Sequence, residues 1–133
     1  MNDFIKKLNK DPYALHLGIR FDHVEDHFAS CSLTVSENMF NFLGVVHGGL
    51  VFSLADAAFS AASNRDHFPS FALDVSGSFL KTAKLGDVLR ADARQIHATN
   101  RTALYCMQVF KGDELIATFN GTVFKSKSRE NAG

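Results

Sequence analysis

Two adjacent glycines and a single carboxylate in one apolar stretch are the residues of this chain best suited to chemistry. Gly48 and Gly49 precede a run of mostly small and apolar residues, Leu50 to Ala62, that contains no glycine or proline, and Asp56 lies in its middle. Such a run predicts a helix. The first amides of a helix lack internal partners and carry the positive end of its dipole, so they can bind an oxyanion. Amide donors together with a carboxylate are the groups that acyl-group chemistry needs.

The predicted helix is apolar nearly all round, which favours burial on most of its sides. A lone carboxylate such as Asp56 is costly in a buried position unless it is paired, hydrogen-bonded or put to use. Asp56 is therefore either a structural carboxylate, in the core or at a subunit contact, or a catalytic group. The glycine pair on the same helix favours the catalytic interpretation.

The spacing of these groups along the helix bears on how they could work together. From Gly49 to Asp56 is seven residues, which places both on one face of the helix but about 10 Å apart along its axis. A thioester or ester carbonyl needs the amide and the attacking group each at about 3 Å, so one helix cannot supply both. A twofold dimer with antiparallel helices would bring Asp56 of one copy to the glycines of the other. The sequence thus predicts an oligomer with shared sites.

The loop before the helix carries further candidates. His47 directly precedes the glycines, where a neutral histidine can either cap the loop or donate to a substrate carbonyl. Asn41 can either make an Asx turn or hold a water or a carbonyl. Phe42 and Phe59 lie near the predicted site and are candidates for binding an acyl or aryl group, with core packing as the alternative for each.

No pattern of ligands predicts a metal or a redox cofactor. His23 and His27, with Asp22 and Asp26, could suggest a metal cluster, but they fall at an expected strand-to-strand turn where their side chains would diverge. There is no phosphate-binding glycine loop of the dinucleotide type. We therefore expect a site that uses neither metal nor cofactor.

Length and composition bound the class of protein. The 133 residues suffice for one domain, residues 1–133, with a core over about 15–125 and a frayed tail at 126–133. A net charge of zero gives no electrostatic reason to bind nucleic acid or an anionic membrane. Without a signal-like or membrane-spanning stretch, and with Cys31 and Cys106 expected as buried thiols, we predict a cytoplasmic protein.

The expected order of elements is short helices, two strands, the long helix and four strands. Residues 2–10 can form an amphipathic helix, and Asp11-Pro12 is typical of an N-cap and first helical position, with Gly18 ending the next turn. The strands expected from alternation and turn signals are 19–26, 27–35, 70–80, 88–97, 102–111 and 114–124. Hairpin-linked strands make the sheet largely antiparallel, and a single apolar helix requires it to curve. The predicted fold class is α+β.

The loop and the helix also share a spacing that resembles the signature of hotdog-fold acyl-CoA thioesterases of the phenylacetate-degradation (PaaI-like) type. The matching residues are Asn41-x-x-Gly44-x-x-His47-Gly48-Gly49-x-x-x-x-Leu54-x-Asp56. Asp74 and the segment 79–87 resemble the family's next strand and turn, so the resemblance covers about residues 15–125. Two positions depart from it: Ala72 stands near where many relatives have Ser or Thr, and Thr82 where they often have proline.

The resemblance implies a long central helix wrapped by a curved antiparallel sheet of about six strands, and a homodimer or homotetramer (dimer of dimers). It implies hydrolysis of an acyl-CoA thioester to free acid and coenzyme A. Asp56 would be the nucleophile or general base, and the amide of Gly48, with Gly49, would form the oxyanion hole across the dimer interface. Asn41 would position water or the carbonyl, and His47 would shape the loop and contact the thioester oxygen.

Two other functions compete with hydrolysis. A hotdog-fold hydratase or dehydratase of enoyl or hydroxyacyl thioesters would set a catalytic His47 against Asp56, although the chain lacks that branch's proline-bracketed loop. A non-catalytic acyl-CoA-binding module would have no need of a buried charge. No residue of the motif specifies the natural acyl group or the basic residues that meet the phosphates of coenzyme A.

Overall fold

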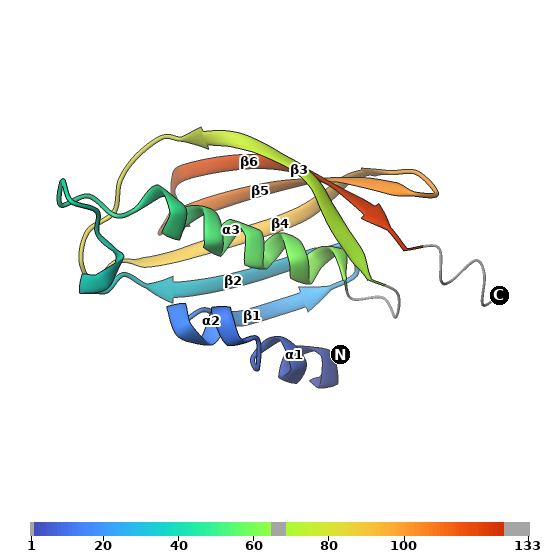
Figure 1. The fold of residues 1–133 in the computed structure, drawn as a ribbon, viewed down its shortest axis with the longest axis horizontal. Coiled ribbons are helices and arrows are strands. Elements are labelled where there is room, and N and C mark those ends of the chain that lie inside the picture. The colour runs from blue at the N-terminus through green and yellow to red at the C-terminus, as the bar shows by residue number, and fades with distance from the viewer. Residues whose placement is uncertain (1, 65–68, 127–133) are drawn as a thin grey trace.

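A long helix lies along the inner face of a curved sheet in the computed structural model, which describes residues 2–64 and 69–126 (Figure 1). The helix is α3, Gly48–Ser63, and all strand pairings are antiparallel in the order β1-β2-β4-β5-β6-β3. The strands are β1 Arg20–Glu25, β2 Phe28–Thr34, β3 Ser70–Phe79, β4 Val88–Ala98, β5 Thr102–Lys111 and β6 Glu114–Lys125. Each strand boundary lies within one residue of its predicted position. The predicted α+β class and the predicted helix wrapped by a curved sheet are both confirmed.

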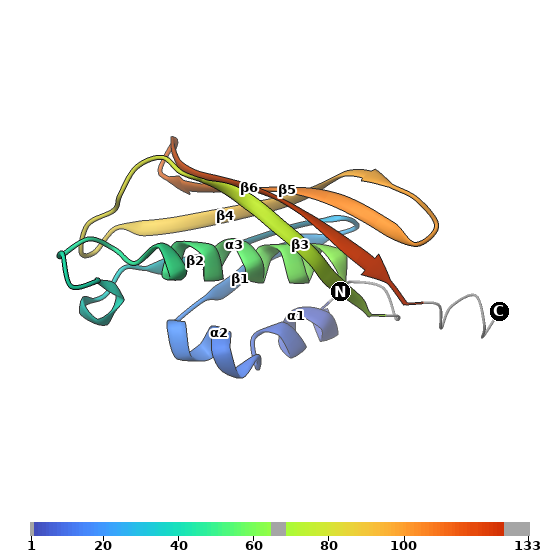
Figure 2. The same cartoon turned by 45° about the horizontal axis from the view of Figure 1, so that its top comes forward.

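Two short helices precede the sheet, α1 (Asn2–Leu8) and α2 (Pro12–Leu17). The Asp11 side chain accepts a hydrogen bond from the amide of Ala14 at 3.0 Å, and Gly18 ends α2 in the left-handed region at φ 75°. Both predicted caps are confirmed, whereas α1 ends two residues earlier than expected. In Figure 2 both helices lie below α3, with α2 toward its amino end and α1 toward its carboxyl end.

One side of α3 is closed by the sheet. Leu54 and Ala58 of the helix are fully buried, as is Cys31 of β2, whose thiol donates to the carbonyl of Leu54 at 3.4 Å. Burial, with smaller contributions from the nearby charges of Asp22 and Asp92, raises the pKa of the Cys31 thiol. The prediction of a buried thiol is confirmed for Cys31, whereas Cys106 is only half-buried.

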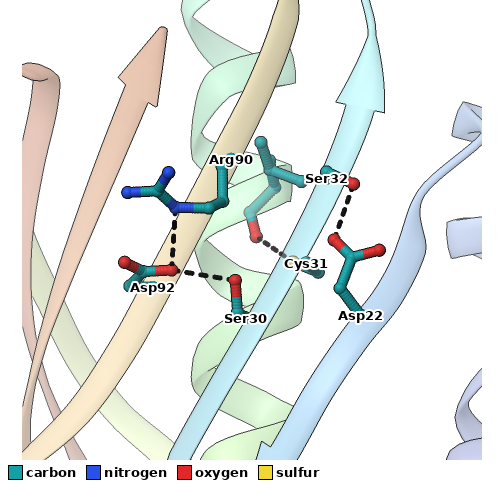
Figure 3. Close-up of polar contacts among 7 residues, drawn as sticks. Asp22, Ser30, Cys31, Ser32, Arg90 and Asp92 are labelled. Carbon is teal, nitrogen blue, oxygen red and sulfur yellow. Dashed lines mark hydrogen bonds and ion pairs between the residues drawn. The ribbon is translucent and has the colours of Figure 1, made fainter. Parts of the chain in front are cut away.

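The outer face of the same strands carries a polar network (Figure 3). The Ser30 hydroxyl donates to Asp92 at 2.9 Å, and Arg90 pairs with the same carboxylate at 3.2 Å. On the same face but toward β1, the Ser32 hydroxyl donates to Asp22 at 2.7 Å. Because Ser30 and Ser32 are buried and alternate with inward residues, the network fixes the register of β1, β2 and β4.

The opposite end of the sheet is open. β3 pairs only with β6, and nearly all of its residues are exposed, including Phe71, Leu73 and Phe79. Gly77 lets the two strands approach closely, because a Cβ there would lie 2.3 Å from the carbonyl oxygen of Thr118. In the described ranges no helix is long and apolar enough to cross a membrane. The expected frayed tail, apart from residue 126, lies outside the described residues.

Candidate active site

The amino end of α3 presents one amide that the protein itself leaves unused. His47 is the N-cap, and its Nδ1 accepts from the amide of Gly49 at 3.3 Å, while its own amide donates to Met39 at 2.8 Å. None of the hydrogen bonds among the described residues uses the amide of Gly48. Because Nδ1 is an acceptor, neutral His47 carries its proton on Nε2, where it can still donate. The two glycines therefore differ: Gly49 is capped and Gly48 is available.

An aromatic cluster stands against this end of the helix. A Cβ at Gly48 would lie 3.4 Å from the ring of Phe79 on β3. Phe79 packs edge-on to Phe119 of β6, and Phe52 of α3 packs edge-on to the same ring. Apolar rings beside an amide lower the local dielectric, which strengthens a hydrogen bond from that amide to a substrate oxygen.

Asp56 is exposed, which corrects the expectation of a buried carboxylate. Gly49, Phe52, Asp56 and Ser60 are all exposed and form one stripe along α3, so the helix is not buried on most sides within one chain. No hydrogen bond or ion pair to Asp56 is found within the described chain. The surrounding protein still removes enough water from its carboxyl to raise its pKa. The result is an unpaired carboxylate with increased basicity.

The amide of Gly48 and the carboxylate of Asp56 lie far apart along α3. Asp56 follows Gly48 by eight residues in an uninterrupted helix, about 12 Å along the axis. The single chain therefore does not bring the carboxylate and the free amide to one carbonyl, as the sequence spacing predicted.

Asn41 organises the loop that leads into the helix. Its Oδ1 accepts from the amides of Leu43 and Val45 at 2.9 and 3.1 Å, which makes the predicted Asx turn. In the described part of the chain its side-chain NH₂ group has no partner and can donate. Phe42, at the tip of the loop, is 93% exposed.

Phe59 belongs to the core. It is 1% exposed, packs on Tyr105 at a ring distance of 5.6 Å, and occupies the space that a Cβ on Gly121 would need. This location favours core packing, the alternative considered from the sequence, and gives no support to contact with a substrate. The sequence signal for it is its spacing from Ala55 and Ala62, both buried on the same face of α3.

A contact that sequence reasoning missed ties α2 to the site. The Ser53 hydroxyl donates to the carbonyl of Gly49 at 2.8 Å, and the Tyr13 hydroxyl donates to Ser53 at 3.0 Å. Forty residues separate Tyr13 from Ser53, so no local pattern could predict the pair. Between α2 and the amino end of α3 lies a groove of about 630 Å³ whose lining includes His16, Arg20, His47 and Gly49.

The histidines near β1 do not gather ligands. His23 Nε2 lies 2.7 Å from Glu25 of the same strand, and both side chains are exposed. Among the described residues, no group of three or more His, Cys, Asp or Glu side chains could hold a metal ion.

Comparison with known proteins places this geometry in context. Residues 43–118 match the thioesterase superfamily. The chain is 33% identical over 112 residues to the acyl-coenzyme A thioesterase PaaI of Escherichia coli, covering 84% of this chain and 80% of that protein. The solved structure of the Escherichia coli PaaI protein from the phenylacetic acid degradation operon superposes with a TM-score of 0.86 at 30% identity, covering 91% of this chain and 88% of that one. A Streptococcus mutans protein bound to acetyl-CoA gives 0.76 at 27% identity, covering 81% and 88%.

Proposed function

The chain belongs to the thioesterase superfamily as a PaaI-like hotdog thioester hydrolase, and on that premise we propose that it cleaves an acyl-CoA thioester in a site shared by two copies. The observation that carries the proposal is a pair of unused groups on α3. They are the amide of Gly48 at its amino end and, two turns further on in the exposed stripe, the unpaired carboxylate of Asp56, whose pKa is raised. These are the donor and the base that thioester hydrolysis requires.

The open end of the sheet supports pairing of two copies. β3 is an edge strand with unpaired backbone groups, and Phe71, Leu73 and Phe79 expose apolar surface along it. Exposed edges and contiguous apolar patches favour association. In a twofold dimer with β3 against β3 and the two α3 helices antiparallel, Asp56 of each copy approaches Gly48 of the other. Such dimers can pair further into a homotetramer.

Hydrolysis in this site follows from the groups present. The thioester oxygen accepts from the amide of Gly48, and Nε2 of His47 or the NH₂ group of Asn41 is placed to assist. Asp56 of the second copy takes a proton from water, whose oxygen attacks the carbonyl carbon. The tetrahedral intermediate then collapses, the C–S bond breaks, and the proton passes to the thiolate of coenzyme A. Direct attack by Asp56, with hydrolysis of the resulting anhydride, uses the same placement.

The test is thiol release from acetyl-, octanoyl-, phenylacetyl- and benzoyl-CoA by the wild type and by Asp56→Asn. The wild type is expected to release thiol from at least one of these, and Asp56→Asn to be slower by a factor of about 10²–10⁴, the range for a lost general base. Unchanged circular dichroism would show that the variant is folded. Equal rates in both proteins would remove Asp56 from the mechanism. Binding of acyl-CoA without thiol release would make the chain a binding module instead.

A further inference from the structure

A second groove, of about 610 Å³, lies between the amino-terminal helices and the carboxyl half of α3. Its walls come from α1, from the turn into α2, from the carboxyl end of α3 and from Pro69, directly before β3. The lining includes Phe4, Leu8, Pro12, Ser60, Asn64 and Pro69. Figure 2 shows α1 below this half of α3. The volume falls within the range of about 300–1,000 Å³ that is usual for small-molecule sites.

The groove begins next to the carboxylate. Ser60, in its lining, follows Asp56 by one helical turn, about 6 Å along the axis. Toward the amino end of α3, Tyr13 of α2 is hydrogen-bonded to Ser53 of α3 at 3.0 Å, and Tyr13 also lines the first groove. When the carbonyl of a thioester is held at Asp56, this groove of the same chain is therefore close enough to receive the attached acyl group.

The lining suits an apolar group. Phe4 and Leu8 are half-buried and pack against the core, and Pro12 and Pro69 add further apolar surface. The polar side chain of Asn64 is already occupied, because it donates to the carbonyl of Ser70 and accepts from the amide of Ser70. Polar groups that are already paired make no demand on a ligand.

The charged residues of the groove lie at its rim. Lys7 and Lys10 are exposed to solvent, and Asp11 is engaged as the cap of α2. The groove at the amino end of α3 combines apolar residues, Leu15, Leu17 and Leu50, with His16, Arg20 and Asn38. Both grooves can hold a hydrocarbon chain or a ring, and the one lined by Phe4 and Leu8 is favoured because Ser60 brings it within one helical turn of Asp56.

We propose that this groove binds the acyl group of the thioester and that Phe4 and Leu8 of α1 limit the size of the group accepted. The inference rests on the proposed thioesterase function and adds a specificity element to it. It makes the amino-terminal helix, which lies outside the catalytic motif, the part of the chain that selects the substrate.

The experiment compares Leu8→Ala with Leu15→Ala, the same change in the lining of the other groove. The readout is the ratio of kcat/KM for lauroyl-CoA to that for butyryl-CoA, which does not depend on the fraction of folded protein. Removing the Leu8 side chain lengthens the groove and is expected to raise the ratio about tenfold, a typical value for small changes in an apolar pocket. Leu15→Ala is expected to leave it unchanged.

A filling variant, Leu8→Phe, tests the proposal in the opposite direction and is expected to lower the same ratio. A ratio that stays at the wild-type value in both Leu8 variants would overturn the inference and leave the thioesterase function standing. A change confined to Leu15→Ala would assign the acyl group to the other groove. Absence of hydrolysis by the wild type would instead remove the proposed function, and this inference with it.

Discussion

Strands β2 and β3 have similar small and apolar sequences but opposite surroundings. β2 has five successive buried residues, with α3 on its inner face and the polar network of Ser30 and Ser32 on its outer face. β3 has no residue in the buried class, although it carries Phe71, Leu73 and Phe79. The difference comes from sheet order, because β2 is an interior strand and β3 an edge.

The two sides of the sheet therefore have different roles. On the closed side, around β2 and β4, α3 covers the inner face and the polar network buries Ser30 and Ser32 on the outer face of β2, so these side chains contribute to folding stability. On the open side, along β3 and the stripe of α3 that carries Asp56, apolar and ionisable groups remain exposed. Substitutions on the closed side should therefore change stability, and those on the open side should change activity and association.

The sharpest contrast uses the same substitution on both sides. Leu54 is fully buried, so Leu54→Ala is expected to lower the free energy of unfolding by about 2–5 kcal/mol. Leu73 is 59% exposed, so Leu73→Ala is expected to change it by no more than about 0.5 kcal/mol at low protein concentration. Urea denaturation of both variants measures the difference. A comparable loss in both would show that Leu73 of β3 is as well covered as Leu54 of α3.

The catalytic role of the open side can be tested by removing one amide hydrogen. Proline at the first helical position keeps a helix intact but has no N–H, and His47 already has the extended backbone that a following proline requires. Gly48→Pro is therefore expected to lower kcat by a factor of about 10²–10³, the effect of losing one oxyanion donor.

Gly48→Ala is the matched control, since it places a Cβ at the same 3.4 Å from Phe79 and retains the amide. It should keep most of the activity. If the alanine and proline variants lost activity equally, crowding against Phe79 would be the cause and the Gly48 amide would have no special role.

A smaller difference in stability is expected between two serine-to-alanine variants, one on each side of the sheet. Ser30→Ala removes a buried hydroxyl that donates to a carboxylate, and the expected cost is about 1.5–3 kcal/mol of unfolding free energy. Ser76→Ala on β3 changes an exposed residue and should cost less than about 0.5 kcal/mol. Thermal unfolding of both variants measures the difference. If Ser30→Ala unfolded at the same temperature as the wild type, the buried hydrogen bond would contribute nothing to stability.

The smallest effect is the pH dependence of Asp56. Its pKa is raised by desolvation, so the folded chain favours the protonated form and ionisation costs stability as pH rises through the folded pKa. Asp56→Asn is then as stable as the wild type at acid pH and slightly more stable at neutral pH. Activity should increase over the same pH range as the base ionises. A variant less stable than the wild type at neutral pH would contradict this sign.

Local signals in the sequence account for most of the fold. Alternation and turn residues placed all six strands, and Asp11, Pro12 and Gly18 marked the ends of α2. The short 3₁₀ helix η1, Glu37–Met39, was not predicted, because it lies in the loop before α3 where no periodic pattern exists. The Tyr13–Ser53 contact was missed because it depends on how α2 docks.

The error over Asp56 has a physical cause. An apolar pattern all round a helix indicates that something covers each side, but it does not say whether the cover comes from the same chain. For α3 the sheet covers one side, and the stripe with Phe52 and Asp56 stays open. The motif from Asn41 to Asp56 located the candidate groups, whereas the capping of Gly49 by His47 and the core position of Phe59 required the structure.

The two-turn distance between Gly48 and Asp56 also has a genetic consequence. Suppose that each site takes the Gly48 amide from one copy and the Asp56 carboxylate from the other. A variant without that amide and a variant without that carboxylate are then each inactive alone. When the two are produced together, about half of the dimers contain one of each, and one of their two sites is intact. Two damaged genes would then restore about a quarter of the normal activity, a complementation that a site built within one chain could not give.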